Sequence, residues 1–253
     1  QLLKNLGSLN PGNPRLAFGL NHRFKAGVVA LFEQLSRQKL GRIYWIRGRY
    51  GKKLSSSGRQ EWRMRLEQSG GGILLDQGIH LVDIVNQIAG GFEDVHSLIS
   101  ANYTEDPALE DNVFVSLRNR EKQISVSLHS TSVDWRYLFS LEIVGSDGSA
   151  ILNGLRTGSG RYGAELLSLR RAETDQDLEL DFTPEQDNSF LLEHDAFFNF
   201  IDGDSSGRLG TLDDMVNLQS LTDRIYAADQ MFAAARQTGL KQAGLETHDS
   251  SLQ

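Results

Sequence analysis

The residues best suited to chemistry lie together between Ser69 and Asp83, in the stretch Ser-Gly-Gly-Gly-Ile-Leu-Leu-Asp-Gln-Gly-Ile-His-Leu-Val-Asp. Asp76 and His80 are four residues apart, so on a helix they share one face. A carboxylate beside an imidazole can fix the ring's tautomer, and such a histidine can accept a hydroxyl proton. The alternative is a buried histidine satisfied by a neighbouring aspartate in an amphipathic helix. The spacing implies no third ligand, so it does not indicate a metal site.

Three glycines, Gly70 to Gly72, come directly before this predicted helix. Glycines allow a ligand to approach the backbone closely, and the first amides of a helix have no partner within the helix. We therefore expect Gly71 and Gly72 to contact a bound molecule.

Composition excludes several classes of protein. The 253 residues carry a net charge of −7, which argues against a nucleic-acid partner. The absence of cysteine excludes disulfides and thiolate metal sites and is consistent with a cytoplasmic protein. No apolar run approaches the roughly 18 residues that indicate a membrane span, and the first residues lack the apolar core of a signal peptide.

The order of elements predicts an α+β fold. Helices are expected at 25–38, 72–89, 189–202 and 212–236, and strands at 15–20, 43–47, 113–117, 124–128, 139–144, 150–153, 164–170 and 178–182. Consecutive strands without intervening helices predict a large, mostly antiparallel sheet of six or seven strands with helices on one face. Its other face would then be solvated or buried against another copy, so we expect a homodimer or tetramer through the sheet.

Five motifs in order resemble the glucose–fructose oxidoreductase, inositol dehydrogenase and rhizopine catabolism (Gfo/Idh/MocA) family of oxidoreductases. The first is the Gly-Gly-Gly-x-Leu-x-Asp-x-Gly-x-His-x-x-Asp pattern at 70–83. The others are Ala-Phe-Gly-Leu-Asn-His-Arg-Phe at 17–24, Lys-Leu-Gly-Arg-Ile at 39–43, Glu-Trp-Arg at 61–63, and Trp-Arg-Tyr-Leu-Phe-Ser-Leu-Glu-Ile-Val-Gly at 135–145. The resemblance as a whole covers about residues 5–236.

The resemblance implies an NAD- or NADP-dependent oxidoreductase that acts on a hydroxyl of a sugar, a nucleotide sugar or a polyol. His80 would take the hydroxyl proton, and Asp76 would orient the His80 ring. Asn21 and His22 would lie near substrate and nicotinamide, with a strand-end cap as the alternative, and Gly71 and Gly72 would join Asn21 beside the cofactor.

Three further side chains are candidates for substrate binding under the same resemblance. Trp135 and Tyr137 would line the sugar pocket, with core or interface packing as the alternative. Arg63 would meet an anionic group, with a solvated surface arginine as the alternative.

The chain also departs from the family pattern. It has no Gly-rich strand–turn–helix at its start, and none of its four prolines follows a lysine, so the family's Glu-Lys-Pro motif is missing. We therefore expect residues 1–40 to be a one-strand, one-helix remnant of a Rossmann domain, 41–238 a substrate-binding and oligomerisation domain, and 239–253 a polar tail. Gly158 to Gly163 fits Gly-x-Gly-x-x-Gly but precedes a strand pattern, which indicates a loop.

Two functions remain open from the sequence. One is the substrate-binding part of an NAD(P)-dependent sugar or polyol dehydrogenase that is inactive without a cofactor domain. The other is a non-catalytic sugar-binding or dimerisation module.

Overall fold

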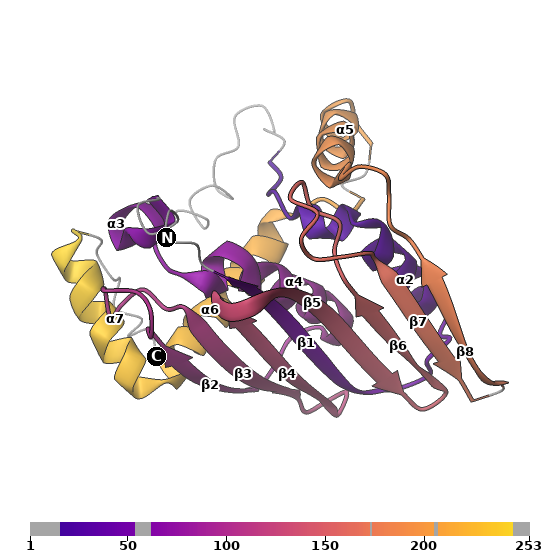
Figure 1. Ribbon diagram of the computed structural model, residues 1–253, viewed down its shortest axis with the longest axis horizontal. Helices are drawn as coiled ribbons and strands as arrows, with labels where there is room; N and C mark the ends of the chain where they lie inside the picture. Colours follow the sequence, from indigo (N-terminus) through magenta and orange to yellow (C-terminus); the bar gives the residue numbers. More distant parts are fainter. Residues whose placement is uncertain (1–15, 54–61, 173, 205–206, 245–253) are drawn as a thin grey trace.

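The computed structural model of the chain describes residues 16–53, 62–172, 174–204 and 207–244. One eight-stranded sheet forms its centre, with the strand order β2-β3-β4-β1-β5-β6-β7-β8 (Figure 1). β1 is parallel to β4, and every other neighbouring pair is antiparallel. The strands are β1 (Ile43–Lys53), β2 (Asp94–Ser100), β3 (Asn112–Asn119), β4 (Ile124–Thr131), β5 (Val133–Gly145), β6 (Gly148–Asn153), β7 (Leu166–Arg171) and β8 (Thr174–Asp181).

Alternation of side chains sets the sheet's two faces. In β4, Ile124, Val126 and Leu128 are buried while Ser125 and Ser127 are exposed. The buried set belongs to one continuous hydrophobic core. The expected alternation is confirmed, and Ser146 and Asp147 join β5 to β6, between the strands expected at 139–144 and 150–153.

The edge strand β2 has no counterpart in the expected elements. Its sequence mixes polar and apolar residues on both faces, and Leu98 is 72% exposed. Side chains outside the strand help to hold it, because Asp229 accepts a hydrogen bond from the Ile99 amide at 2.8 Å and Ser97 donates to the Ile225 carbonyl at 2.7 Å. These contacts come from residues more than a hundred positions away, so alternation alone could not reveal the strand.

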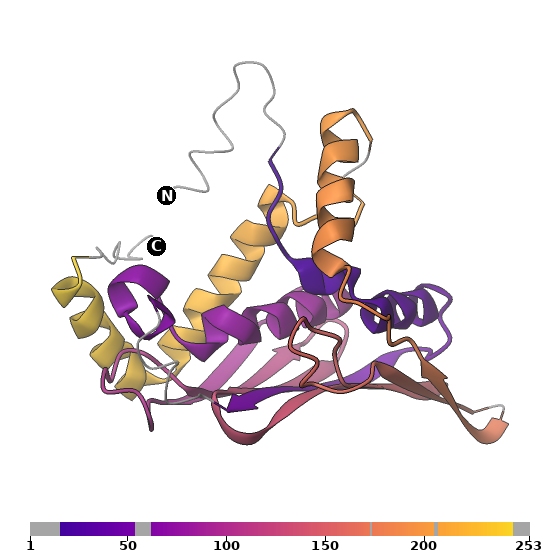
Figure 2. The ribbon, with the colours of Figure 1, turned by 45° about the horizontal axis from the view of Figure 1, so that its top comes forward.

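The helices cover one face of the sheet, which confirms the expected fold class (Figures 1 and 2). They are α2 (Ala26–Ser36), α3 (Leu66–Ser69), α4 (Ile79–Ala89), α5 (Ser189–Ile201), α6 (Leu212–Ala228) and α7 (Gln230–Gln242). α4 contributes Leu81, Ile84 and Val85 to the core, all essentially inaccessible. α5 instead projects from this layer (Figure 2). None of the described helices is long and apolar enough to cross a bilayer.

The expected remnant at residues 1–40 is described from residue 16 onward. The strand expected at 15–20 is reduced to one isolated bridge, Phe18 with Gly210, because the structure describes no neighbouring strand to continue the pairing. The helix is present as α2, and its Val28 and Leu31 are fully buried in the same core as the sheet. α2 therefore packs against the sheet, and the domain boundary at residue 40 stays a prediction.

The C-terminal helix expected at 212–236 is two helices. Asp229 separates them, and its carboxylate accepts the Phe232 amide at 3.0 Å to cap α7. α6 begins with a capping box between Thr211 and Asp214. α7 continues to Gln242, so residues 239–242 are helical rather than part of the expected tail, most of which lies outside the described residues.

Candidate functional site

Asp76 and His80 lie on either side of a change in helix type. Residues Leu74–Gly78 form a π-helical turn, and α4 begins at Ile79. A π-helical turn contains more residues than an α-helical turn, so residues four apart take different neighbours. The sequence predicted the helix here but not this irregularity, which is common at functional sites.

Two of the glycines before the turn, Gly70 and Gly72, are needed by the fold itself. Gly70 ends α3 in the left-handed conformation, with φ of 71°. A Cβ on Gly72 would lie 1.8 Å from the Glu110 carbonyl oxygen. The Gly72 amide donates to the Glu110 carboxylate at 2.8 Å, so the protein itself satisfies this amide, and contact of Gly71 and Gly72 with a cofactor stays a prediction.

Glu110 caps the start of this helix from a distant part of the chain. Its carboxylate also accepts the Leu74 amide at 3.1 Å and the Tyr226 hydroxyl at 2.7 Å. Burial raises the pKa of Glu110, although these hydrogen bonds act in the opposite direction. Glu110 could not be predicted from the sequence, because it lies 38 residues beyond Gly72 and belongs to no recognisable motif.

Asp76 is held by two cations and not by His80. The Asp76 carboxylate pairs with Lys52, and Arg63 Nε donates to Asp76 Oδ1 at 2.9 Å. Burial acts to raise the pKa of Asp76, but Lys52 and Arg63 outweigh it and hold the pKa below the ordinary value. The expected Asp76–His80 orienting contact is therefore replaced by an ion-paired aspartate.

His80 lies beside the other predicted histidine. The His22 and His80 rings stack with centroids 3.8 Å apart and planes 12° from parallel. Nδ1 of His80 is buried and has no hydrogen-bond partner among the described residues. Burial lowers the pKa of His80 to about 4, although Asp83 and Asp76 act to raise it. His80 is therefore a neutral imidazole at physiological pH.

Asn21 and His22 sit in the short 3₁₀ turn Asn21–Phe24 and are both buried. His22 contacts the Asn21 side-chain oxygen at 3.1 Å and the Tyr50 hydroxyl at 3.1 Å. Burial, reinforced by nearby His80 and Lys25, lowers the pKa of His22 well below its ordinary value. The adjacent Arg23 pairs with Asp83 of α4, at 2.5 and 2.8 Å, which ties the turn to the helix that carries His80.

Most of the predicted site residues thus fall into two adjoining groups. The first, which we call the histidine group, is Asn21, His22, Tyr50 and His80. The second, the cavity group, lines a cavity of about 170 Å³ and includes Lys52, Arg63, Gly71, Gly72, Asp76 and Glu110. The π-helical turn joins the two groups.

Tyr137 and Trp135 lie in different surroundings. The Tyr137 ring meets Tyr162 edge-on at 5.1 Å, and Tyr162 meets Tyr50 at 5.3 Å, so Tyr137 is connected to the histidine group. Trp135 is 83% exposed and lies under Lys53 Nζ at 4.4 Å, lining a separate hollow. The structure therefore does not place Trp135 in the cavity group.

The segment Gly158–Gly163 is a turn that leads into β7, so its interpretation as a loop is confirmed. It delivers Tyr162 to the site, where the Tyr162 hydroxyl accepts a hydrogen bond from Gln77 Nε2 at 2.9 Å. No group of three or more acidic or histidine side chains suited to a metal is found among the described residues.

Comparison with known proteins identifies the domain. None of the curated proteins matches the sequence, but residues 28–151 match the family model of the GFO/IDH/MocA C-terminal domain. Among solved structures, aldose-aldose oxidoreductase from Caulobacter crescentus complexed with glycerol superposes with a TM-score of 0.70 at 18% identity, covering 86% of this chain and 62% of its own.

Two further structures share the fold. Levoglucosan dehydrogenase, in complex with NADH and levoglucosan, gives a TM-score of 0.69 at 16% identity and covers 86% of this chain and 65% of its own. The UDP-N-acetylglucosamine 3-dehydrogenase of Acidithiobacillus ferrooxidans gives 0.64 at 14% identity, with 86% and 62% covered. This chain therefore spans less than two thirds of the length of these structures. Over residues 28–151 it is a C-terminal domain of the GFO/IDH/MocA family.

Proposed function

We propose that this chain is the substrate-binding part of an NAD(P)-dependent oxidoreductase acting on a hydroxyl of a sugar, a nucleotide sugar or a polyol. One observation carries the proposal: His80 is a neutral, partly buried imidazole whose buried Nδ1 has no partner among the described residues. An unpaired buried polar atom is costly and calls for an explanation. A substrate hydroxyl would provide the missing partner.

The described residues do not form the principal site for a dinucleotide. Such a site needs a Gly-rich turn that opens a helix with free amides, whereas the Gly72 amide is bonded to Glu110 and Gly158–Gly163 leads into a strand. In a complete enzyme the nicotinamide would supply the hydride acceptor. The residues of this chain would act on the proton and on the position of the substrate.

His80 would accept the hydroxyl proton because it is neutral and thus has a free ring nitrogen. The nearby charges of Asp83 and Asp76 favour the protonated ring, so they would stabilise it once it has formed. Asp76 would act through this field and by holding Lys52 and Arg63 at the cavity. Lys52 was not predicted from the sequence, because β1 is longer than the pattern at 43–47 indicates.

The cavity group favours a polar, hydroxyl-rich substrate. Arg63 and Lys52 provide donors on one side, and the half-exposed Trp62 ring, stacked under Arg63 at 4.5 Å, provides a flat apolar surface. Sugars combine hydroxyl edges with apolar ring faces, which matches this lining. An anionic group on the substrate would gain from the two cations.

The test is turnover of a complete enzyme on a panel of sugars, nucleotide sugars and inositols with NAD and NADP. His80→Ala should lower kcat by roughly 10²–10⁴, the usual contribution of general acid–base catalysis, with little change in substrate affinity. His96→Ala, at an exposed histidine on the open face of the sheet, is the matched control. Full activity in His80→Ala would exclude the assigned role, and sugar binding without any turnover would favour a binding module instead.

We also propose that the chain forms a homodimer or tetramer through the open face of the sheet. Trp45 (38% exposed), Phe114 (46%) and Leu98 (72%) lie on that face among serines and the Arg47–Glu142 ion pair. An exposed face with several large apolar residues usually marks an interface. Light scattering should show an oligomer at tens of micromolar that Trp45→Asp dissociates; a clean monomer would contradict the proposal.

A further inference from the structure

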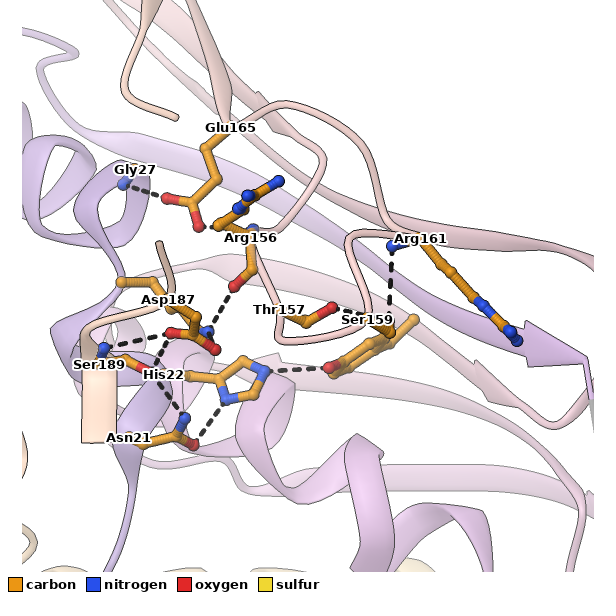
Figure 3. A network of polar contacts seen from close by, with 12 residues as sticks. Asn21, His22, Gly27, Arg156, Thr157, Ser159, Arg161, Glu165, Asp187 and Ser189 are labelled. Carbon is orange, nitrogen blue, oxygen red and sulfur yellow. Dashed lines mark hydrogen bonds and ion pairs between the residues drawn. The ribbon is translucent and has the colours of Figure 1, made fainter. Parts of the chain in front are cut away.

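A continuous chain of hydrogen bonds runs from Tyr50 on β1 to Asp187, in the loop before α5. Figure 3 shows its members His22, Asn21, Ser189 and Asp187. The Tyr50 hydroxyl contacts His22 Nε2 at 3.1 Å, and His22 Nδ1 contacts Asn21 Oδ1 at 3.1 Å. Asn21 Nδ2 donates to Ser189 Oγ at 2.9 Å, and Ser189 Oγ donates to Asp187 Oδ1 at 2.7 Å. The chain therefore links three segments that are far apart in the sequence.

The carboxylate at one end fixes the direction of every bond. Asp187 is ionised, because its bonds to Lys25 and Ser189 hold the pKa below its ordinary value despite burial. An ionised carboxylate only accepts, so the single hydroxyl proton of Ser189 is committed to it. Ser189 Oγ must then accept from the Asn21 amide, which leaves Asn21 Oδ1 facing His22.

The same logic sets the state of the histidine. Because Asn21 Oδ1 can only accept, His22 Nδ1 must carry a proton. Burial keeps His22 neutral, so its Nε2 is unprotonated and accepts from the Tyr50 hydroxyl. His22 is thus the Nδ1–H tautomer, and both of its ring nitrogens are engaged.

The anchor of the chain is itself buried and charged. Lys25, only 3% exposed, donates to Asp187 Oδ2 at 2.8 Å and to the Arg156 carbonyl at 2.6 Å. The Ser189 amide adds a further bond to Asp187 at 3.1 Å. The loop before α5 is therefore fixed against the start of α2, and the position of Ser189 relative to Asn21 follows from that contact.

We propose that Asp187 and Ser189 are positioning residues that act through Asn21 to fix the tautomer of His22 and to hold its ring flat against His80. The catalytic meaning of this device rests on the proposed role of His80 as proton acceptor. The tautomer and the ring stack are properties of the chain itself and can be measured without substrate or cofactor.

The stack matters because the His22 ring excludes water from one face of His80. The charged and titratable groups around His80 come from four elements: His22 on the 3₁₀ turn, Lys25 before α2, Asp76 on the π-helical turn and Asp83 on α4. The two aspartates favour a protonated His80, whereas desolvation and Lys25 oppose it. If the His22 ring turned away, water would reach His80 and its desolvation would weaken. The effect of the two aspartates would then dominate, and the pKa of His80 would rise.

Histidine-selective ¹⁵N spectroscopy of the intact chain tests the proposal. Two-bond ¹H–¹⁵N correlations distinguish the Nδ1–H from the Nε2–H tautomer, and His22→Gln and His80→Gln assign the signals. We expect His22 to be the Nδ1–H form in the unaltered chain. In Ser189→Ala the Asn21 amide loses its acceptor and can rotate, so the Nε2–H form should become populated and the pKa of His80 should rise from about 4 toward its ordinary value of 6.5.

Two variants separate positioning from general loss of structure. Ser189→Thr keeps the hydroxyl and should retain both the tautomer and the pKa of His80. Ser140→Ala removes a buried hydroxyl that donates to Asn153 elsewhere, at 2.8 Å, and should leave both unchanged. An Nε2–H form of His22 in the unaltered chain would overturn the proposal without any variant, and so would an unchanged tautomer and pKa in folded Ser189→Ala.

Failure of this proposal is distinct from failure of the proposed function. Full turnover in His80→Ala with the expected tautomer would remove the role of His80 but leave the network standing. Lost turnover in His80→Ala with an unchanged His22 in Ser189→Ala would keep His80 as the base and overturn the network.

Discussion

The covered face of the sheet and the 3₁₀ turn at residues 21–24 are both buried, but different forces hold them. Under α4, the core consists of apolar residues such as Leu81 and Ile84 with no accessible surface. In the turn, Asn21, His22 and Arg23 are polar and still only 6–7% exposed. Apolar contact is non-directional, whereas a buried polar group must meet its partner at a set geometry. Packing therefore builds this domain, whereas a polar network orients the side chains of the candidate site.

The polar turn is also where distant parts of the chain meet. Arg23 reaches α4 through Asp83 and α6 through Asp214, at 3.0 Å. Lys25 reaches the loop before α5 through Asp187, and the Gly27 amide donates to Glu165 at 2.8 Å. A buried network of this kind stabilises the fold only when all of its members are paired, because the loss of one member leaves a buried charge without its partner.

Removing Arg23 should produce the largest loss of stability, because it leaves the buried Asp83 carboxylate without a cation, with only the Gln87 amide, at 3.3 Å, as a side-chain hydrogen-bond donor. Arg23→Ala should lower the free energy of unfolding by about 3–5 kcal/mol. Arg47→Ala is the matched control: Arg47 also grips a carboxylate, Glu142, with two nitrogens, but its side chain is 56% exposed. That change should cost less than about 1 kcal/mol. Urea denaturation measures both, and equal losses would contradict the distinction between the two settings.

A methyl group on Gly72 should come next. Its Cβ would collide with the Glu110 carbonyl at 1.8 Å, so the backbone of one segment must move. We expect Gly72→Ala to cost about 3 kcal/mol, at the upper end of overpacking. Gly158, whose Cβ would meet nothing within 4 Å, is the control and should change stability by less than about 0.5 kcal/mol. An unchanged stability in Gly72→Ala would show that packing does not require glycine at residue 72 and would favour a ligand contact as its reason.

Local pattern was enough to predict most of the fold. Alternation located seven of the eight strands observed, because half-buried strands imprint a period of two on the sequence. It did not locate β2, which is held through bonds from its Ser97 to the Ile225 carbonyl of α6 and from its Ile99 amide to Asp229. It also did not locate the division between α6 and α7 at Asp229, whose carboxylate binds the strand and caps α7.

The site was predictable only in part, and for a physical reason. The motif at 70–83 identified His80 and Asp76, and the motif at 17–24 identified Asn21 and His22, since each pair lies within one short segment. Their true partners are distant in the chain: Tyr50, Lys52, Asp187 and Ser189. Spacing carries no information about contacts that tertiary packing creates. The role of Gly72 stays a prediction, because an amide at a helix start can be satisfied by the protein itself, as the Gly72 amide is by Glu110.

Protonation of the histidine group should destabilise the fold moderately. The folded pKa of His80 is about 4, below the 6.5 of an unfolded histidine, so the unfolded chain binds the extra proton between these values. Stability is therefore fully present above pH 6.5 and falls as the pH drops toward 4. His80 alone should cost about 2 kcal/mol between pH 7 and pH 5. Urea denaturation at both values tests this, and His80→Asn should flatten the difference. A pH dependence that survives in both His80→Asn and His22→Asn would place the titrating group elsewhere.

The smallest expected effect is that of adding the cofactor to the chain as it stands. A dinucleotide is held mainly by its pyrophosphate at the start of a helix with free amides and by its ribose at an acidic residue. The two glycine segments that could compete for this role differ: Gly72 has its amide bonded to Glu110, and Gly158–Gly163 leads into β7. We therefore expect no measurable heat of binding for NAD or NADP and no dehydrogenase activity from the 253 residues alone.

Thermal unfolding makes the test sensitive, because a ligand at 100 times its Kd would stabilise the fold by about 2.7 kcal/mol, whereas one that does not bind leaves the transition unchanged. Micromolar binding would contradict the expectation, and Gly160→Val, which should then abolish it, would show whether the Gly158–Gly163 loop is responsible.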